Sequence, residues 1–217
     1  MPTTSPSPAR TLARAERAAI ADLAPTLGAD APTLCGDWTV KDLVVHLLMR
    51  ERSPLAQAAG FVPPLSGLAR RAERRWARAD LPLLADQLRR PVLSWAAVPP
   101  LDRLANTVEL FVHHEDLRRA QPGWTPRDLG DAAEDELWRM LRPIAMVTTR
   151  KVGAPVVAVD ARSGRRATVR RGEGPAVVTG RPSELALLLL GRDEVDGVEV
   201  TGPDLAVRRL RIADLGL

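Results

Sequence analysis

The stretch Val108–Trp124, VELFVHHEDLRRAQPGW, contains two of the three histidines of this 217-residue chain. If most of the stretch is α-helical, Glu109 and His113 lie one above the other, because the spacing i, i+4 is slightly more than one turn of about 3.6 residues. Asp116, three residues after His113, joins the same face, whereas His114 points away from it. The segment therefore places two carboxylates and one imidazole side by side on one helix.

Apolar residues flank this polar face, and an unpaired charge at the edge of a buried stripe is costly. Two interpretations follow. In the first, Glu109 accepts a hydrogen bond from His113, and the two residues form a satisfied polar pair within a helical core. In the second, they are two ligands of a metal ion. The apolar stripe consists of Leu104, Val108, Phe111 and Val112.

The remaining histidine, His46, lies in LCGDWTVKDLVVHLL (34–48), on the flank of another apolar helix. A helical bundle could bring His46 across to Glu109 and His113. Two imidazoles and one carboxylate, with a fourth position open for water, suit a catalytic zinc site. Such a metal acts as a Lewis acid and lowers the pKa of a bound water or thiol.

Taken together, LCGDWTVKDLVVHL (34–47) and VELFVHHEDLRRAQPG (108–123) resemble the mycothiol-dependent maleylpyruvate isomerase family, which belongs to the wider DinB-like metal-binding bundles. The family turn is of the type Cys-x-Gly-Trp, and this chain departs from it slightly with Cys-Gly-Asp-Trp at 35–38. The resemblance implies that a divalent metal, usually zinc, binds to three of the matched residues. We assign to Asp116 the role of orienting the other ring nitrogen of one of these ligands. The matched residues are Cys35, Trp38, His46, Glu109, His113 and Asp116, and the implied ligands are His46, Glu109 and His113.

The same resemblance implies mycothiol, a low-molecular-weight thiol, as the cosubstrate of a transferase or isomerase that acts on a small electrophile. The alternative is a non-catalytic metal-binding or small-ligand-binding module. The residues leave several points open: the substrate, the choice of zinc over nickel, iron or manganese, and a monomer or a homodimer. An acidic substrate could bind to an arginine near the C-terminus, with Arg208, Arg209 and Arg211 as candidates.

Composition argues against several other classes of protein. The net charge is +4, but the chain has no tyrosine and only 3% aromatic residues, which is a poor supply for stacking bases; we expect no nucleic-acid partner. The longest apolar run, Leu185–Leu190, is too short to cross a membrane, and the N-terminus lacks the apolar segment of a signal peptide. Cys35 is the only cysteine, which fits a reducing cytoplasm, and a cysteine in a turn is more often structural than reactive.

Apolar periodicity predicts helices over 9–27, 40–59, 66–78, 81–97, 101–120 and 128–149, with Asp37 or Thr39 as the cap of the second. After residue 150 the pattern changes to strands over 155–160, 167–171, 176–180 and 198–202. Ser183 is expected to cap a helix over 184–190, and a last helix covers 204–213. We therefore expect a mainly α fold: a DinB-like four-helix bundle in residues 1–150 and a small α+β domain in residues 151–217. The segment 180–204 resembles the sterol-carrier-like domain that follows the bundle in that family.

Overall fold

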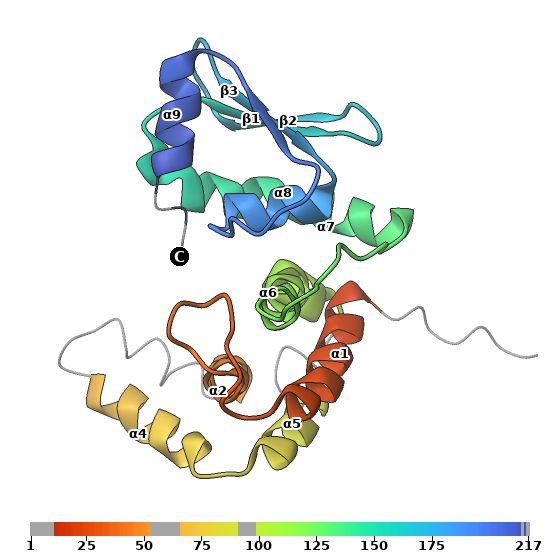
Figure 1. The fold of residues 1–217 in the computed structure, drawn as a ribbon, viewed down its shortest axis with the longest axis vertical. Helices are drawn as coiled ribbons and strands as arrows, with labels where there is room; N and C mark the ends of the chain where they lie inside the picture. The colour runs from red at the N-terminus through yellow and green to blue at the C-terminus, as the bar shows by residue number, and fades with distance from the viewer. Residues whose placement is uncertain (1–10, 53–65, 91–98, 214, 216–217) are drawn as a thin grey trace, which may run out of the picture. The chain divides into compact units, whose positions relative to one another are not determined.

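The structure, a computed structural model, describes residues 11–52, 66–90, 99–213 and 215. The chain divides into two compact units, Met1–Trp124 and Thr125–Leu217 (Figure 1). In the described residues the first unit is helical, and the second combines helices with a four-stranded sheet. The mainly α fold class expected from the sequence is confirmed. None of the described helices is long and apolar enough to cross a membrane.

The helices of the first unit follow the predicted pattern over the described residues. Helix α5 ends at Arg89, earlier than predicted, because the residue before a proline, here Pro91, is disfavoured in the α conformation. The predicted continuations of two helices through residues 53–59 and 91–97 lie outside the described residues. The helices are α1 (Leu12–Leu27), α2 (Val40–Arg52), α4 (Ser66–Ala77), α5 (Leu81–Arg89) and α6 (Pro99–Arg119).

Helix α2 begins where the sequence offers a capping residue. Of the two candidates, Thr39 is the cap: its hydroxyl accepts the N–H of Asp42 at 3.3 Å, and the Asp42 carboxylate accepts the N–H of Thr39 at 3.0 Å. This reciprocal pair satisfies two N–H groups that have no partner within a helix. The cap sets the first turn of α2 and, with it, the face on which His46 lies.

An apolar core holds the helices of the first unit together. Helix α1 packs against α2, α5 and α6, and α2 also packs against α4 and α5. A buried ion pair, Arg17 with Glu51, joins α1 to α2 at 2.7 Å within this core. The core includes Ile20, Ala24, Val40, Leu43, Val44, Leu47, Leu48, Leu84, Leu88, Leu110 and Leu117. The two helices that carry the histidines are therefore packed into one core with α1 and α5.

The second unit is built on a mixed sheet with the strand order β2-β1-β3-β4. Strand β1 pairs antiparallel with β2 and parallel with β3, and β3 pairs antiparallel with β4. The short connection from β2 to β3 passes close to Pro155: Gly172 has φ 145°, and a Cβ on it would lie 2.4 Å from the Pro155 ring. The strands are β1 (Val156–Asp160), β2 (Arg166–Arg170), β3 (Ala176–Gly180) and β4 (Glu199–Thr201).

The helices of the second unit are α7 (Asp131–Thr148), the short 3-10 helix η3 (Thr149–Val152), α8 (Pro182–Leu189) and α9 (Asp204–Ile212). Alternate residues of β1 and β3 are buried, as expected for strands with one face in a core. Helices α7 and α8 pack on each other along one side of the sheet (Figure 1). The core of this unit includes Leu137, Leu141, Ala145, Val156, Ala158, Ala176, Val178, Leu185 and Leu189.

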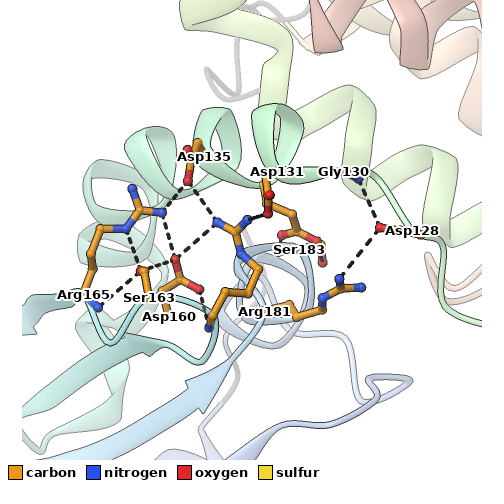
Figure 2. A network of polar contacts seen from close by, with 11 residues as sticks. Asp128, Gly130, Asp131, Asp135, Asp160, Ser163, Arg165, Arg181 and Ser183 are labelled. Carbon is orange, nitrogen blue, oxygen red and sulfur yellow. Dashed lines mark hydrogen bonds and ion pairs between the residues drawn. The ribbon is translucent and has the colours of Figure 1, made fainter.

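Helix α7 lies in the second unit, whereas the sequence led us to expect the domain boundary after it, at residue 150. Helix α7 packs against α8 and β2, and charged side chains also link it to the strands (Figure 2). Arg162, in the turn after β1, contacts Asp131 and Asp135 of α7 at 2.5 and 2.9 Å. Arg165 contacts the same Asp135 at 2.5 Å and Asp160 of β1 at 2.8 Å. These ion pairs, together with the apolar core, attach α7 to the sheet.

The start of α8 differs from the prediction. Ser183 was expected to be the cap, but the helix begins one residue before it, at Pro182, since proline is favoured in the first turn of a helix. The N–H and hydroxyl of Ser183 both donate to Glu134 of α7, each at 2.9 Å. The Glu134 carboxylate, from a neighbouring helix, therefore accepts a backbone N–H at the start of α8, which is the capping role that the sequence analysis assigned to Ser183.

Candidate metal centre

The three candidate ligands come together between α2 and α6. His46 Nε2 and His113 Nε2 lie 3.5 and 3.4 Å from the same oxygen, Oε1 of Glu109. One donor atom from each of the three residues can be chosen so that all lie within 4.8 Å of one another. The helical spacing places Glu109 and His113 on one face of α6, and the His46 side chain of α2 reaches that face.

These distances suit a zinc ion. Zinc bonds to nitrogen and oxygen of about 2.0–2.1 Å place neighbouring ligands of a tetrahedron roughly 3.3 Å apart. The observed separations from the Glu109 oxygen are close to that value. The side chains of His46 and Glu109 are 25% and 19% exposed, so the group is not fully enclosed by protein. The residues present therefore fit a zinc ion in donor type and in spacing.

Asp116 determines which nitrogen of His113 is available. Its carboxylate is fully buried and lies 2.9 Å from Nδ1 of His113. With a proton on Nδ1 donated to Asp116, the lone pair of the neutral ring is on Nε2, the atom that faces Glu109 and His46. This is the arrangement by which a carboxylate orients a metal-binding histidine. The contact agrees with the orienting role expected for Asp116.

The electrostatics of the group favour a charged carboxylate. Burial alone would raise the pKa of Glu109, but hydrogen bonds with His113 and His46 and the nearby Arg50 lower it far below its usual range. Burial alone would lower the pKa of His113, but its hydrogen bonds, above all that with Asp116, raise it well above the ordinary imidazole value. In the metal-free chain Glu109 is thus an anion and the His113 ring is protonated on both nitrogens at neutral pH, so an ion that binds Nε2 would displace the proton there while Nδ1–H stays on Asp116.

Arg50 is a member of this site that sequence reasoning missed. Its Nε lies 3.5 Å from the Glu109 oxygen, and its Nη1 donates to Asn106 of α6 at 2.5 Å. The spacing contained a signal, since Arg50 follows His46 by four residues and so shares its face of α2. Arg50 holds the Glu109 carboxylate from the side of α2 and joins the two helices beside the donor atoms.

The loop before α2 supplies two further neighbours. The Trp38 ring centroid lies 5.0 Å from that of His46, and this tryptophan is 39% exposed. Cys35 Sγ lies 3.0 Å from Asp116 Oδ2 and 3.7 Å from His113 Nδ1. Both residues belong to the turn that carries the family resemblance, and the structure places both beside the histidines.

His114 takes no part in this group. Its Nδ1 lies 2.5 Å from the carboxylate of Glu16 on α1, and both side chains are buried. It therefore links α6 to α1 by a buried contact, in agreement with its expected position away from the Glu109 and His113 face. The three C-terminal arginines, Arg208, Arg209 and Arg211, are exposed on α9 of the second unit.

Comparison with solved structures finds the same fold elsewhere. The crystal structure of the mycothiol-dependent maleylpyruvate isomerase matches with a TM-score of 0.54 and 16% sequence identity, over 88% of this chain and 90% of that one. A histidine-to-alanine mutant of the mycothiol-dependent maleylpyruvate isomerase matches with a TM-score of 0.59, 17% identity and the same coverage. No protein-family model and no curated protein sequence matches the chain. The resemblance noted in the sequence is thus confirmed at the level of the fold.

Proposed function

We propose that this chain is a metal-dependent enzyme in which His46, Glu109 and His113 bind zinc and a low-molecular-weight thiol, mycothiol or a relative of it, is the cosubstrate. The reaction class is thiol transfer to, or thiol-assisted isomerisation of, a small electrophile. The observation that supports this most strongly is the convergence of two imidazole nitrogens and one carboxylate oxygen from two helices. Three protein ligands are the usual number at a catalytic zinc site, where the fourth position is left for water or substrate.

Each residue of the site has a distinct role in this proposal. His46 and His113 offer the lone pairs of their Nε2 atoms, and Glu109 offers a carboxylate oxygen. Asp116 holds the proton on Nδ1 of His113 and thereby keeps Nε2 available. Arg50 holds Glu109 in place. A bound zinc ion would favour the thiolate form of the cosubstrate at neutral pH.

The shared fold supports the choice of thiol, because the solved structures with this fold are described as mycothiol-dependent. A fold alone does not fix a function, so the argument for this chain rests on its own donor atoms. We also propose the finer architecture expected from the sequence: a DinB-like four-helix bundle, which forms the metal-binding domain, and a sterol-carrier-like α+β domain. A cytoplasmic location, as a monomer or a homodimer, completes the proposal.

Metal analysis of the purified chain tests the ligand assignment. The metal-free protein is reconstituted with zinc, passed over a desalting column and analysed for metal content. We expect about one zinc per wild-type chain, as for a single catalytic site, and loss of that zinc in His46→Ala and in His113→Ala. Since the two histidines lie on different helices, loss in both variants would show that one site spans α2 and α6.

His114→Gln is the matched control, because it also removes one of the three histidines but alters the contact with Glu16. It should retain the full equivalent of zinc. A wild-type chain that holds no zinc after reconstitution would contradict the metal assignment, and so would an unchanged zinc content in His113→Ala. Either result would favour the satisfied polar pair and a non-catalytic module.

A separate measurement tests the thiol. Calorimetric titration of mycothiol into the zinc-loaded chain should show binding, and the same titration into the metal-free chain should show a much weaker interaction. A methylated thiol serves as the control, since it keeps the rest of the cosubstrate but cannot form a thiolate. Equal binding of the thiol and its methyl ether would contradict a role for the sulfur atom at the metal.

A further inference from the structure

A second set of donor atoms shares His113 with the first. Cys35 Sγ, His113 Nδ1 and Asp116 Oδ2 lie within 4.8 Å of one another, and in the described residues this is the other group of histidine, cysteine and carboxylate side chains with that property. The separations are 2.9 Å from Nδ1 to Oδ2, 3.0 Å from Sγ to Oδ2 and 3.7 Å from Sγ to Nδ1. A sulfur, a nitrogen and an oxygen thus form a compact triangle next to the first set.

The two sets use opposite nitrogens of the same imidazole ring. A neutral imidazole has one lone pair, so His113 serves either set but not both at once. In either case the ring nitrogen that does not bind the metal keeps its proton, and a carboxylate of the other set accepts a hydrogen bond from it. When Nε2 is the ligand, Nδ1–H donates to Asp116 at 2.9 Å. When Nδ1 is the ligand, Nε2–H faces Glu109 at 3.4 Å.

The loop that carries Cys35 is fastened to α6 next to this triangle. The backbone N–H of Leu34 donates to the carbonyl oxygen of Asp116 at 3.2 Å. The side-chain amide of Gln121, further along the same segment, donates to the carbonyl of Pro32 at 3.1 Å. Two hydrogen bonds therefore hold the loop at α6, so the thiol is positioned beside the ring before any ion arrives.

We propose that Cys35, His113 and Asp116 form a second metal position, selective for thiophilic divalent ions such as cadmium, that excludes zinc from the first position because both need His113. Soft ions prefer thiolate ligands, and the second set has a thiolate where the first has an imidazole. When cadmium binds to the metal-free chain, the thiol proton of Cys35 and the Nδ1 proton of His113 pass to solvent, and the ring keeps its proton on Nε2, which faces Glu109. The exclusion of zinc rests on the proposed function, whereas the Cys35 set does not depend on it.

Titration of the full-length, metal-free chain with cadmium tests the proposal, because a cadmium–thiolate bond gives an ultraviolet charge-transfer band. Cys35 is the only cysteine of the chain, so the band reports on this residue alone. We expect the band in the wild type, its loss in Cys35→Ser, and its retention in His46→Ala, which lacks a ligand of the first set only. Cadmium affinity in Cys35→Ser should fall by more than the roughly 10-fold that loss of a group supporting a ligand costs, because the thiolate is itself a ligand.

Competition with zinc tests the exclusion. In the zinc-loaded wild type, enough cadmium to saturate the band should release the bound zinc, so that total metal stays at one ion per chain. The His46→Ala chain, which has not been loaded with zinc, should develop the same band. Absence of the band in the wild type would overturn the second position, whatever its zinc content. Two metal ions bound together would overturn the sharing of His113. If circular dichroism shows that Cys35→Ser does not fold, His113→Ala gives the same test. The band should be lost in that variant, and its retention would overturn the assignment of His113 to the second position.

Discussion

Asp116 and His113 are linked by a 2.9 Å contact between a fully buried carboxylate and Nδ1 of the ring, one helical turn apart on α6. The contact connects the buried interior of the helical unit with the ring whose other nitrogen, Nε2, lies 3.4 Å from Glu109. Asp116 therefore influences which tautomer His113 adopts, although its carboxylate contacts Nδ1 and the proposed metal-binding atom is Nε2. The first prediction follows from this relationship.

Replacing Asp116 by asparagine should lower zinc affinity by about 10- to 100-fold, the range typical for loss of a group that orients a metal-binding histidine. Asparagine still offers a carbonyl oxygen to the Nδ1–H of His113, but it lacks the negative charge that makes the ring a better ligand. Competition with a chromophoric chelator measures the change. Asp37→Asn, an exposed carboxylate in the same unit, is the control and should bind zinc as the wild type does. Equal affinity in the two variants would contradict the orienting role.

Zinc should stabilise the folded chain against heat. An ion that binds only the folded state at 100 times its dissociation constant adds about 2.7 kcal/mol to the free energy of unfolding. Differential scanning calorimetry should show a higher Tm with zinc, a return to the original Tm after chelation, and no response in His46→Ala. A rise in Tm of the same size in His46→Ala would place the stabilising zinc elsewhere.

The buried ion pair between Arg17 and Glu51 should be costly to break. Removal of one partner leaves an uncompensated charge in the core of the helical unit, and such changes cost about 3–5 kcal/mol. Urea unfolding of Glu51→Gln should show a loss of this order, with a smaller loss in the double variant Arg17→Met, Glu51→Leu. The exposed pair Asp86 and Arg90 offers the comparison, since surface pairs contribute about 0–1 kcal/mol. Similar losses at the two pairs would show that burial does not govern the cost.

Acid should weaken the second unit through Asp160. Burial alone would raise the pKa of this carboxyl, but hydrogen bonds from Arg165, Ser163 and Arg162 lower it to about 2, compared with about 3.9 in an unfolded chain. A carboxyl with a lowered pKa contributes stability above the unfolded value and loses that contribution as the pH falls towards the folded value. The free energy of unfolding should therefore fall between about pH 4 and pH 2.

Asp160→Asn is the corresponding test, because it keeps a polar side chain of the same shape without the titrating group. The variant should be less stable at pH 7 and should show a weaker loss of stability between about pH 4 and pH 2. Chemical unfolding at a series of pH values measures both effects. A pH dependence identical to that of the wild type would assign the acid sensitivity to other carboxylates of the chain.

Much of the local structure could be predicted from the sequence. The period of apolar residues identified α2 and α6, and the spacing of Glu109, His113 and Asp116 placed them on one face. These predictions succeed because a helix repeats every 3.6 residues whatever surrounds it. The strands of the second unit followed in the same way from short β-branched runs between turn residues.

The predictions that depended on a neighbouring element were less complete. Ser183 was assigned as a cap, yet the group that satisfies it is Glu134, 49 residues earlier in the chain. Helix α7 was expected to lie before the domain boundary, but it packs against α8 and β2 in the second unit, where Arg162 and Arg165 also pair with it. No local pattern distinguishes a helix that packs on other helices from one that packs on a sheet.

The sequence by itself thus indicated His46, Glu109 and His113 as candidate ligands, because donor type and helical spacing are local properties. Only the tertiary structure decided which polar side chains meet. His46 reaches Glu109 across 63 residues, Cys35 reaches Asp116 across 81, and His114 turns instead to Glu16 across 98. The reason is physical: the packing of apolar side chains in the core sets how α1, α2 and α6 approach one another, and the polar groups meet where that packing leaves them.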